Sequence, residues 1–291
     1  MVASDIGSRR LREIFESESY YRIPDYQRAY EWKPKKLDKL WEDLMKTYEE
    51  DPKNKHEDYF LGPLVIDASR YPELEIIDGQ QRLVTISLML CALRDLVKDY
   101  TREIKGEDEV TNINDFLEYI NGFITKNGEG LLILGDNKNN DRIVFREILN
   151  PDSDMESKEQ VMKENYKRHK IWKNYKSLRT NLAELCKICG LTSQASDITK
   201  SISLIRIIID DMLAHVYFAH VKINDRKNVF QIFESLNAKG QLLQQAALIK
   251  NHIMKSCSKN YRSEYKRRWE EVLKNHGEKD DPFLYESYLS R

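Results

Sequence analysis

The sequence lacks the features that would assign it to a membrane or secreted class. No apolar run approaches the roughly 18 to 20 residues that a membrane-spanning helix needs. The first residues have no basic flank followed by an apolar stretch, so they do not resemble a signal peptide. Only four cysteines occur, which fits a reducing compartment better than a disulfide-stapled scaffold. We therefore expect a cytoplasmic protein with no membrane partner.

Two familiar kinds of site are also missing. No Gly-x-x-x-x-Gly-Lys-Ser/Thr segment occurs, which excludes a P-loop NTPase. Cys186 and Cys189 form a single CxxC, without a second pair or two nearby histidines. Structural zinc sites take a fuller set of ligands, so this pair indicates ordinary core or surface cysteines.

Charge of one sign is not in excess either. The net charge is −1, which argues against a DNA footprint spread over the whole molecule. Basic stretches at residues 33–39 and 262–274 leave local DNA-binding faces open, although such runs are typical of solvated helix faces. With 41% hydrophobic residues in 291, the composition predicts a globular protein with a sizeable core.

Hydrophobic spacing predicts an α+β fold, with a small mixed α/β head at residues 1–105 and a mostly helical extension at 106–291. In the head we expect an extended piece at 20–24, helices at 8–16, 34–50 and 81–100, and strands at 60–67 and 73–78. The extension is predicted to hold a strand at 215–223 and helices at 165–189, 196–211, 227–236, 245–257 and 262–275. The run at 205–209 is equally compatible with a strand.

The segment at 76–83 carries the clearest chemical pattern. An apolar strand ends in Asp78 and Gly79, and a helix begins at once, so backbone N–H groups and the helix dipole would favour an anion there. Asp78 is a candidate to hold magnesium or orient water, and Gln80, Gln81 and Arg82 are candidates to bind phosphate and neutralise developing charge. The alternative is a polar strand-to-helix turn with Asp78 as its cap.

A second candidate is the aromatic-rich loop at residues 23–32. Its aromatic rings would stack on a base, while Arg28 would form a forked contact with phosphate and Gln27 lies beside it. The alternative is that Tyr26, Tyr30 and Trp32 cap the hydrophobic core.

Two further segments add weaker signals. Gly62 at the start of a strand would permit close approach of backbone to a ligand, although a simple turn explains it as well. Far along the chain, Asn237 and Gly240 are typical of a helix C-terminus, within a second motif at 230–251.

Taken in order, four motifs resemble the N-terminal domain family of GmrSD-type modification-dependent restriction enzymes. They are Ile-Pro-x-Tyr-Gln-Arg-x-Tyr-x-Trp at 23–32, Phe-Leu-Gly at 60–62, Asp-Gly-Gln-Gln-Arg-Leu at 78–83 and Phe-Glu-Ser-Leu-Asn-Ala-Lys-Gly at 233–240. Each motif is of moderate specificity, but together they span about three quarters of the chain. That family looks like a branch of the ParB/sulfiredoxin superfamily, so the resemblance implies a ParB-like head.

The resemblance also implies a nucleotide-binding, NTP-hydrolysing sensor or regulatory domain of an anti-phage restriction system, with Mg²⁺ as cofactor and modified DNA as a further ligand. Carried over by motif, the site residues are catalytic Asp78 (also the metal ligand), Gln80, Gln81 and Arg82, and nucleotide-binding Tyr26, Gln27, Arg28, Tyr30, Gly62, Gly79, Asn237 and Gly240. The other interpretation is a non-catalytic DNA-binding or protein-interaction module.

The chain departs from the family in one respect. Relatives commonly continue into an HNH-type nuclease, whereas His252 and His276 lack a supporting metal set. We therefore expect no nuclease activity from this chain, and a C-terminal HNH-type nuclease half or a separate nuclease subunit as its partner.

Overall fold

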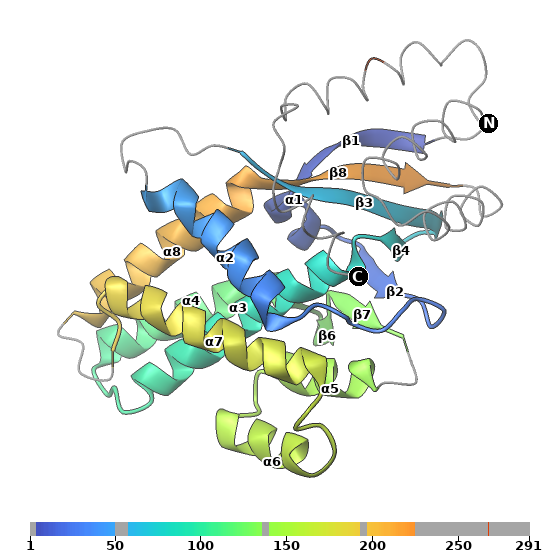
Figure 1. The fold of residues 1–291 in the computed structure, drawn as a ribbon. Coiled ribbons are helices and arrows are strands. Elements are labelled where there is room, and N and C mark those ends of the chain that lie inside the picture. Colours follow the sequence, from blue (N-terminus) through green and yellow to red (C-terminus); the bar gives the residue numbers. More distant parts are fainter. Residues whose placement is uncertain (1–3, 50–57, 136–139, 193–196, 225–266, 268–291) are drawn as a thin grey trace. The chain divides into compact units, whose positions relative to one another are not determined.

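The computed structural model has an α+β fold, as the sequence predicts (Figure 1). It describes residues 4–49, 58–135, 140–192, 197–224 and Arg267. Over these residues the chain forms two compact units whose segments alternate along the sequence. Unit 1 comprises 4–23, 58–80 and 215–224, and unit 2 comprises 24–49, 81–135, 140–192 and 197–214. The division into 1–105 and 106–291 stays a prediction.

Unit 1 is built on a mixed sheet with strand order β1-β8-β3-β4-β2 (Figure 1). β1 runs antiparallel to β8 and β4 antiparallel to β3, whereas β8 is parallel to β3 and β2 is parallel to β4. The elements are β1 Ser4–Arg10, α1 Leu11–Phe15, β2 Tyr20–Ile23, β3 Tyr59–Arg70, β4 Glu73–Asp78 and β8 Val216–Ile223. Sequence-distant β8 therefore lies between the N-terminal strand and β3.

The apolar run in β3 explains its central place in the sheet. Leu64, Val65 and Ile66 are all fully buried, as expected for a strand covered on both faces. The strands predicted at 60–67, 73–78 and 215–223 are confirmed. The helix predicted at 8–16 is wrong in its first turn, because Ser8, Arg9 and Arg10 pair with β8 and the helix begins at Leu11. Tertiary strand pairing overrides the local helical pattern there.

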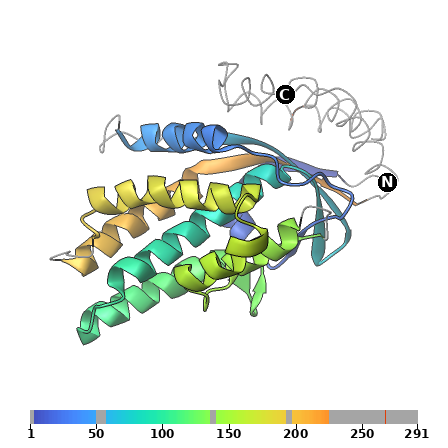
Figure 2. The same cartoon turned by 60° about the horizontal axis from the view of Figure 1, so that its bottom comes forward.

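Unit 2 is mostly helical, and α7 lies beside α2 in both views (Figures 1 and 2). α3 forms the inner helix, with every residue from Gln81 to Val97 buried. The elements are α2 Pro34–Glu49, α3 Gln80–Thr101, α4 Glu107–Ile124, β5 Thr125–Lys126, β6 Glu129–Gly130, β7 Leu132–Leu134, α5 Asp141–Leu149, α6 Met155–Asn165, α7 Lys170–Ile188 and α8 Ile198–His215.

The structure decides one open sequence prediction for unit 2 and corrects another. The run at 205–209 is helical within α8, because Ile202, Ile205 and Ile209 recur at helical spacing on its buried side. The single helix predicted at 165–189 is wrong in its first turn, since α6 ends at Asn165 and α7 begins only at Lys170.

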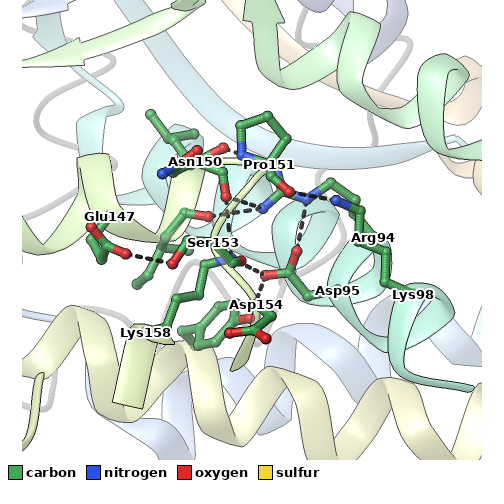
Figure 3. A network of polar contacts seen from close by, with 12 residues as sticks. Arg94, Asp95, Lys98, Glu147, Asn150, Pro151, Ser153, Asp154 and Lys158 are labelled. Atoms are coloured by element: carbon green, nitrogen blue, oxygen red, sulfur yellow. Dashed lines mark hydrogen bonds and ion pairs between the residues drawn. The ribbon is translucent and has the colours of Figure 1, made fainter. Parts of the chain in front are cut away.

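A buried ionic cluster joins three helices of unit 2 (Figure 3). Arg94 of α3 is fully buried and donates from Nη1 to the Leu149 carbonyl and from Nη2 to the Ile148 carbonyl, both at 2.9 Å. It also donates from Nε to Asp95 Oδ1 at 2.7 Å. The last carbonyls of a helix have no partner within it, so Arg94 caps the C-terminus of α5 from another helix.

In the same cluster both cations share the single carboxylate of Asp95. Lys158 Nζ lies 3.0 Å from Asp95 Oδ2 and 2.5 Å from the Ser153 carbonyl, and the Tyr175 hydroxyl donates to Asp95 Oδ2 at 2.6 Å. Burial raises the pKa of the neighbouring Cys91 to about 12, so that thiol is inert at neutral pH. The Arg94–Asp95–Lys158 cluster thus serves to fix α3, α5 and α6 together.

Some predictions lie outside the described residues. These are the helices at 227–236, 245–257 and 262–275, and nearly all of the basic stretch at 262–274. Among the helices that are described, none is long and apolar enough to cross a bilayer.

Candidate functional site

The β4–α3 junction has the strand, turn and helix order that the sequence predicts. β4 ends at Asp78, Gly79 takes a positive φ of 98°, and α3 begins at Gln80. A Cβ on Gly79 would lie 2.9 Å from Leu64 Cδ1 and 3.0 Å from the Pro63 carbonyl oxygen. Both the dihedral angle and the contact therefore require glycine. The chain enters the helix without a spacer, and, as at every helix start, the first N–H groups of α3 have no acceptor within the helix.

The polar residues in the first turn of α3 are largely covered by protein. Gln80, Gln81 and Arg82 are 6%, 7% and 8% exposed. The Gln81 amide is used within the protein: its Oε1 accepts from the Glu31 N–H at 2.7 Å and its Nε2 donates to the Ala29 carbonyl at 3.0 Å. Gln81 therefore ties the loop at 24–33 to the start of α3.

The second half of that loop is held from several helices of unit 2. The Tyr30 hydroxyl lies 2.7 Å from Thr85 Oγ1 of α3, and its backbone N–H donates to Asp141 Oδ2 of α5 at 2.7 Å. Asn174 of α7 donates to the Tyr30 hydroxyl and to the Trp32 carbonyl. Tyr30 and Trp32 are both buried. They pack into the hydrophobic core, as the alternative interpretation of this loop expects.

Burial decides how Tyr30 can act. The residue is 3% exposed, which leaves almost no ring face for stacking on a base. Burial raises the pKa of the Tyr30 phenol well above its usual range, so the hydroxyl stays protonated in its hydrogen bonds. The buried environment of Tyr30 therefore disfavours the expected stacking of its ring on a nucleotide base.

The first half of the loop is presented outward. Tyr26 is 51% exposed and Arg28 is also exposed, whereas Gln27 is half-buried and donates its N–H to the Pro24 carbonyl at 3.0 Å. This turn lifts an aromatic ring and a guanidinium away from the core. Arg28 directly precedes Ala29, whose carbonyl accepts a hydrogen bond from Gln81 in the first turn of α3.

The remaining predicted site residues are placed separately. Gly62, with φ of 116°, is buried at a bulge where the register of β3 against β8 shifts. Bulges re-aim the chain and are frequent beside active sites. Asn237 and Gly240 lie outside the described residues.

Asp78 offers a single carboxylate to a metal ion. Within the described part of the chain, no three His, Cys, Asp or Glu residues come together as a metal site. Magnesium bound with a nucleotide keeps several waters and takes one or two protein carboxylates plus phosphate oxygens. A half-buried Asp78 at the strand end fits that single-carboxylate role.

Sequence reasoning missed three residues that hold the loop. Asp141 accepts from Tyr30 across 111 residues, Asn174 bonds Tyr30 across 144, and His169 Nε2 lies 3.1 Å from Asp141 Oδ1. They belong to no local motif. The one local signal was a cap: the His169 side chain accepts from the Ile171 N–H at the start of α7.

Comparison with known proteins agrees with the motifs. The family model described as the N-terminal domain of the GmrSD restriction endonuclease matches residues 11–254, well over half of the chain. No curated protein sequence matches the chain. The match includes the described loop and β4–α3 junction as well as the second motif. The chain therefore belongs to the GmrSD N-terminal domain family, which gives it a role in a restriction system and implies a partner nuclease half or subunit.

Proposed function

We propose that this domain binds and hydrolyses a nucleoside triphosphate, and so acts as the sensor or regulatory part of a modification-dependent anti-phage restriction system. One observation carries the proposal. β4 passes directly into α3 through Gly79, and Gln81 in the first turn of α3 is hydrogen-bonded to the loop that presents the exposed Tyr26 ring and the Arg28 guanidinium. Helix starts of this kind favour phosphate.

The phosphates would bind at the first turn of α3. Backbone N–H groups and the positive end of the helix dipole attract the anion, and Arg82 at that turn would neutralise charge that develops in the transition state. Asp78, at the end of β4, would hold Mg²⁺ or orient the attacking water. Magnesium, when bound, would neutralise the phosphate oxygens.

The base would bind at the presented half of the loop. Tyr26 offers an accessible ring for stacking, and Arg28 offers a forked contact to phosphate. We assign Gln81 and Tyr30 to the support of this loop, because their polar groups already bond within the protein. Gln80 keeps its proposed place beside the phosphates, and Asn237 and Gly240 are proposed to complete the site.

Isothermal calorimetry of the full chain with each ribonucleoside triphosphate and magnesium tests the proposal, with Asp78→Ala and Arg82→Ala in parallel. We expect saturable binding that both substitutions weaken by at least tenfold, or about 1.4 kcal/mol. Arg102→Ala is the matched control, since that side chain is 69% exposed and its carboxylate partner is Asp154.

Unchanged affinity in Arg82→Ala would remove the phosphate assignment. If no triphosphate binds, the non-catalytic alternative gains: the same exposed Tyr26 and Arg28 suit a DNA backbone. Modified DNA is then the next ligand, and its affinity should fall steeply with salt.

A further inference from the structure

We infer that Asn174 and Asp141 are positioning residues, which hold the loop at 29–32 so that Tyr26 and Arg28 meet the ligand. The inference rests on the proposed function, because the ligand is the nucleotide of that site. Neither residue belongs to any motif of the sequence, and each reaches the loop from a different helix of unit 2.

Asn174 holds the loop at two points. Its Nδ2 donates to the Tyr30 hydroxyl at 3.1 Å and to the Trp32 carbonyl at 2.8 Å. The side chain is fully buried, so water cannot replace either bond. Its Oδ1 is buried with no hydrogen-bond partner among the described residues. A protein keeps such an amide at a cost, and here both donor bonds go to the loop.

Asp141 holds the loop by its backbone. The carboxylate is 3% exposed and divides its two oxygens, with Oδ2 accepting from the Tyr30 N–H and Oδ1 lying 3.1 Å from His169 Nε2. His169 in turn accepts from the Ile171 N–H through Nδ1. The imidazole therefore orients the carboxylate, and the carboxylate holds the Tyr30 backbone at the first residue of α5.

Together with Gln81, these residues fix consecutive backbone groups. The Ala29 carbonyl, the N–H groups of Tyr30 and Glu31, and the Trp32 carbonyl all bond to side chains of α3, α5 or α7. Four successive residues outside any helix or strand are thus anchored by side chains from three different helices. We call Gln81, Asp141 and Asn174 the loop clamp. The turn at 24–28, in which Tyr26 and Arg28 are exposed, directly precedes the anchored stretch, so a loosened clamp would displace both residues.

The test compares Asn174→Ala with Asn181→Ala in the full chain. Asn181 is also an amide on α7, but its Nδ2 bonds to Asp38 of α2 at 3.3 Å rather than to the loop. Two readouts are taken for each protein: affinity for the nucleoside triphosphate with magnesium, and the rate of limited trypsin cleavage after Arg28. Lys33 precedes Pro34 and is therefore a poor trypsin site, so cleavage after Arg28 reports the loop.

We expect Asn174→Ala to speed cleavage after Arg28 by about tenfold, as local opening becomes easier. Nucleotide affinity should fall by about tenfold as well, because the ligand must first order the loop. Asn181→Ala should match the unsubstituted chain in both readouts. At the second contact, Asp141→Ala should reproduce the loss. Asp141→Asn should restore only part of it, because its amide oxygen still accepts from Tyr30 while its Nδ2 faces the Nε2–H of His169.

Unchanged cleavage after Arg28 in Asn174→Ala would overturn the clamp. Faster cleavage with unchanged nucleotide affinity would overturn the positioning role. If the unsubstituted chain binds no triphosphate, the proposed function fails and the role at a nucleotide site fails with it, while the cleavage rates still show whether these residues hold the loop.

Discussion

Two buried polar clusters of unit 2 differ in what they hold. The Arg94–Asp95–Lys158 cluster consists of ions and joins the helices α3, α5 and α6. The loop clamp of Gln81, Asp141 and Asn174 consists mostly of amides and bonds to a segment without regular structure. The first cluster completes helix ends inside the core. The second directs its bonds to a loop whose neighbouring residues face solvent.

The two clusters differ in the cost of burying their polar groups and in what is lost when one group is removed. Desolvated ions are costly and repay that cost only when every member is bonded, so their removal acts on the whole fold. A neutral amide costs less to bury, and its loss is felt where its partner was held. Stability should therefore depend mainly on the ionic cluster, and ligand binding mainly on the clamp.

The largest effect on stability is expected from Arg94→Met. The substitution leaves two carbonyls at the end of α5 and one Asp95 oxygen without their donor, so the free energy of unfolding should fall by about 3–5 kcal/mol. Urea unfolding measures it, with exposed Arg102→Met as the control. Loop cleavage should rise only in step with global unfolding. A loss below about 1 kcal/mol would show that the cluster is not what joins these helices.

A buried imidazole in unit 1 extends the comparison to a group that is held neutral. Burial lowers the pKa of His220 to about 4, well below the ordinary 6.5. Below pH 6.5 the unfolded chain binds a proton that the folded protein does not, so stability is complete above pH 6.5 and is lost as the pH falls towards 4. The loss should reach about 3 kcal/mol.

Unfolding free energies of the unsubstituted chain and of His220→Phe, measured between pH 7 and pH 4, isolate this contribution. The difference in unfolding free energy between the two proteins should change as the pH falls from 6.5 towards 4 and be constant above pH 6.5. Parallel curves would mean that His220 is protonated equally in the folded and unfolded states.

A smaller effect is expected at the turn before α3. Gly79→Ala forces an L side chain into positive φ and against Leu64, which should cost about 1–3 kcal/mol of unfolding free energy. Gly7→Ala is the matched control, because a Cβ there meets nothing within 4 Å. Thermal unfolding distinguishes the two. Equal stability of both variants would contradict the packing of Gly79 against β3.

The smallest effect on stability is expected from Tyr26→Ala, in the presented half of the loop. Because the ring is 51% exposed, the free energy of unfolding should change by less than about 0.5 kcal/mol. Nucleotide binding should weaken by about 1–3 kcal/mol if the ring stacks on the base. Tyr71→Ala, at an exposed tyrosine in the β3–β4 turn, is the control for calorimetry. Equal affinity in both variants would remove Tyr26 from the site.

Much of this fold could be read from hydrophobic spacing. The strands β3, β4 and β8 and the helices α2 and α3 are confirmed within a few residues, because continuous apolar runs and helical stripes are local signals. α6 was missed since its eleven residues carry few apolar side chains, although Asp154 caps it through the Ser157 N–H at 2.9 Å. At 8–10 the sequence was misleading because strand pairing with β8 is a long-range interaction.

The sequence by itself determined the family, the α+β class and the Asp78–Gly79 turn into α3, since each depends on residues that are close together along the chain. Only the tertiary structure decided which motif residues face solvent. Gln81 and Tyr30 are polar enough to bind a ligand, yet Asp141, Thr85 and Asn174 together with the loop backbone occupy their bonding groups. These partners lie 50 to 144 residues apart in the sequence, so no local spacing connects them, and the difference between a supporting and a presented side chain exists only in the fold.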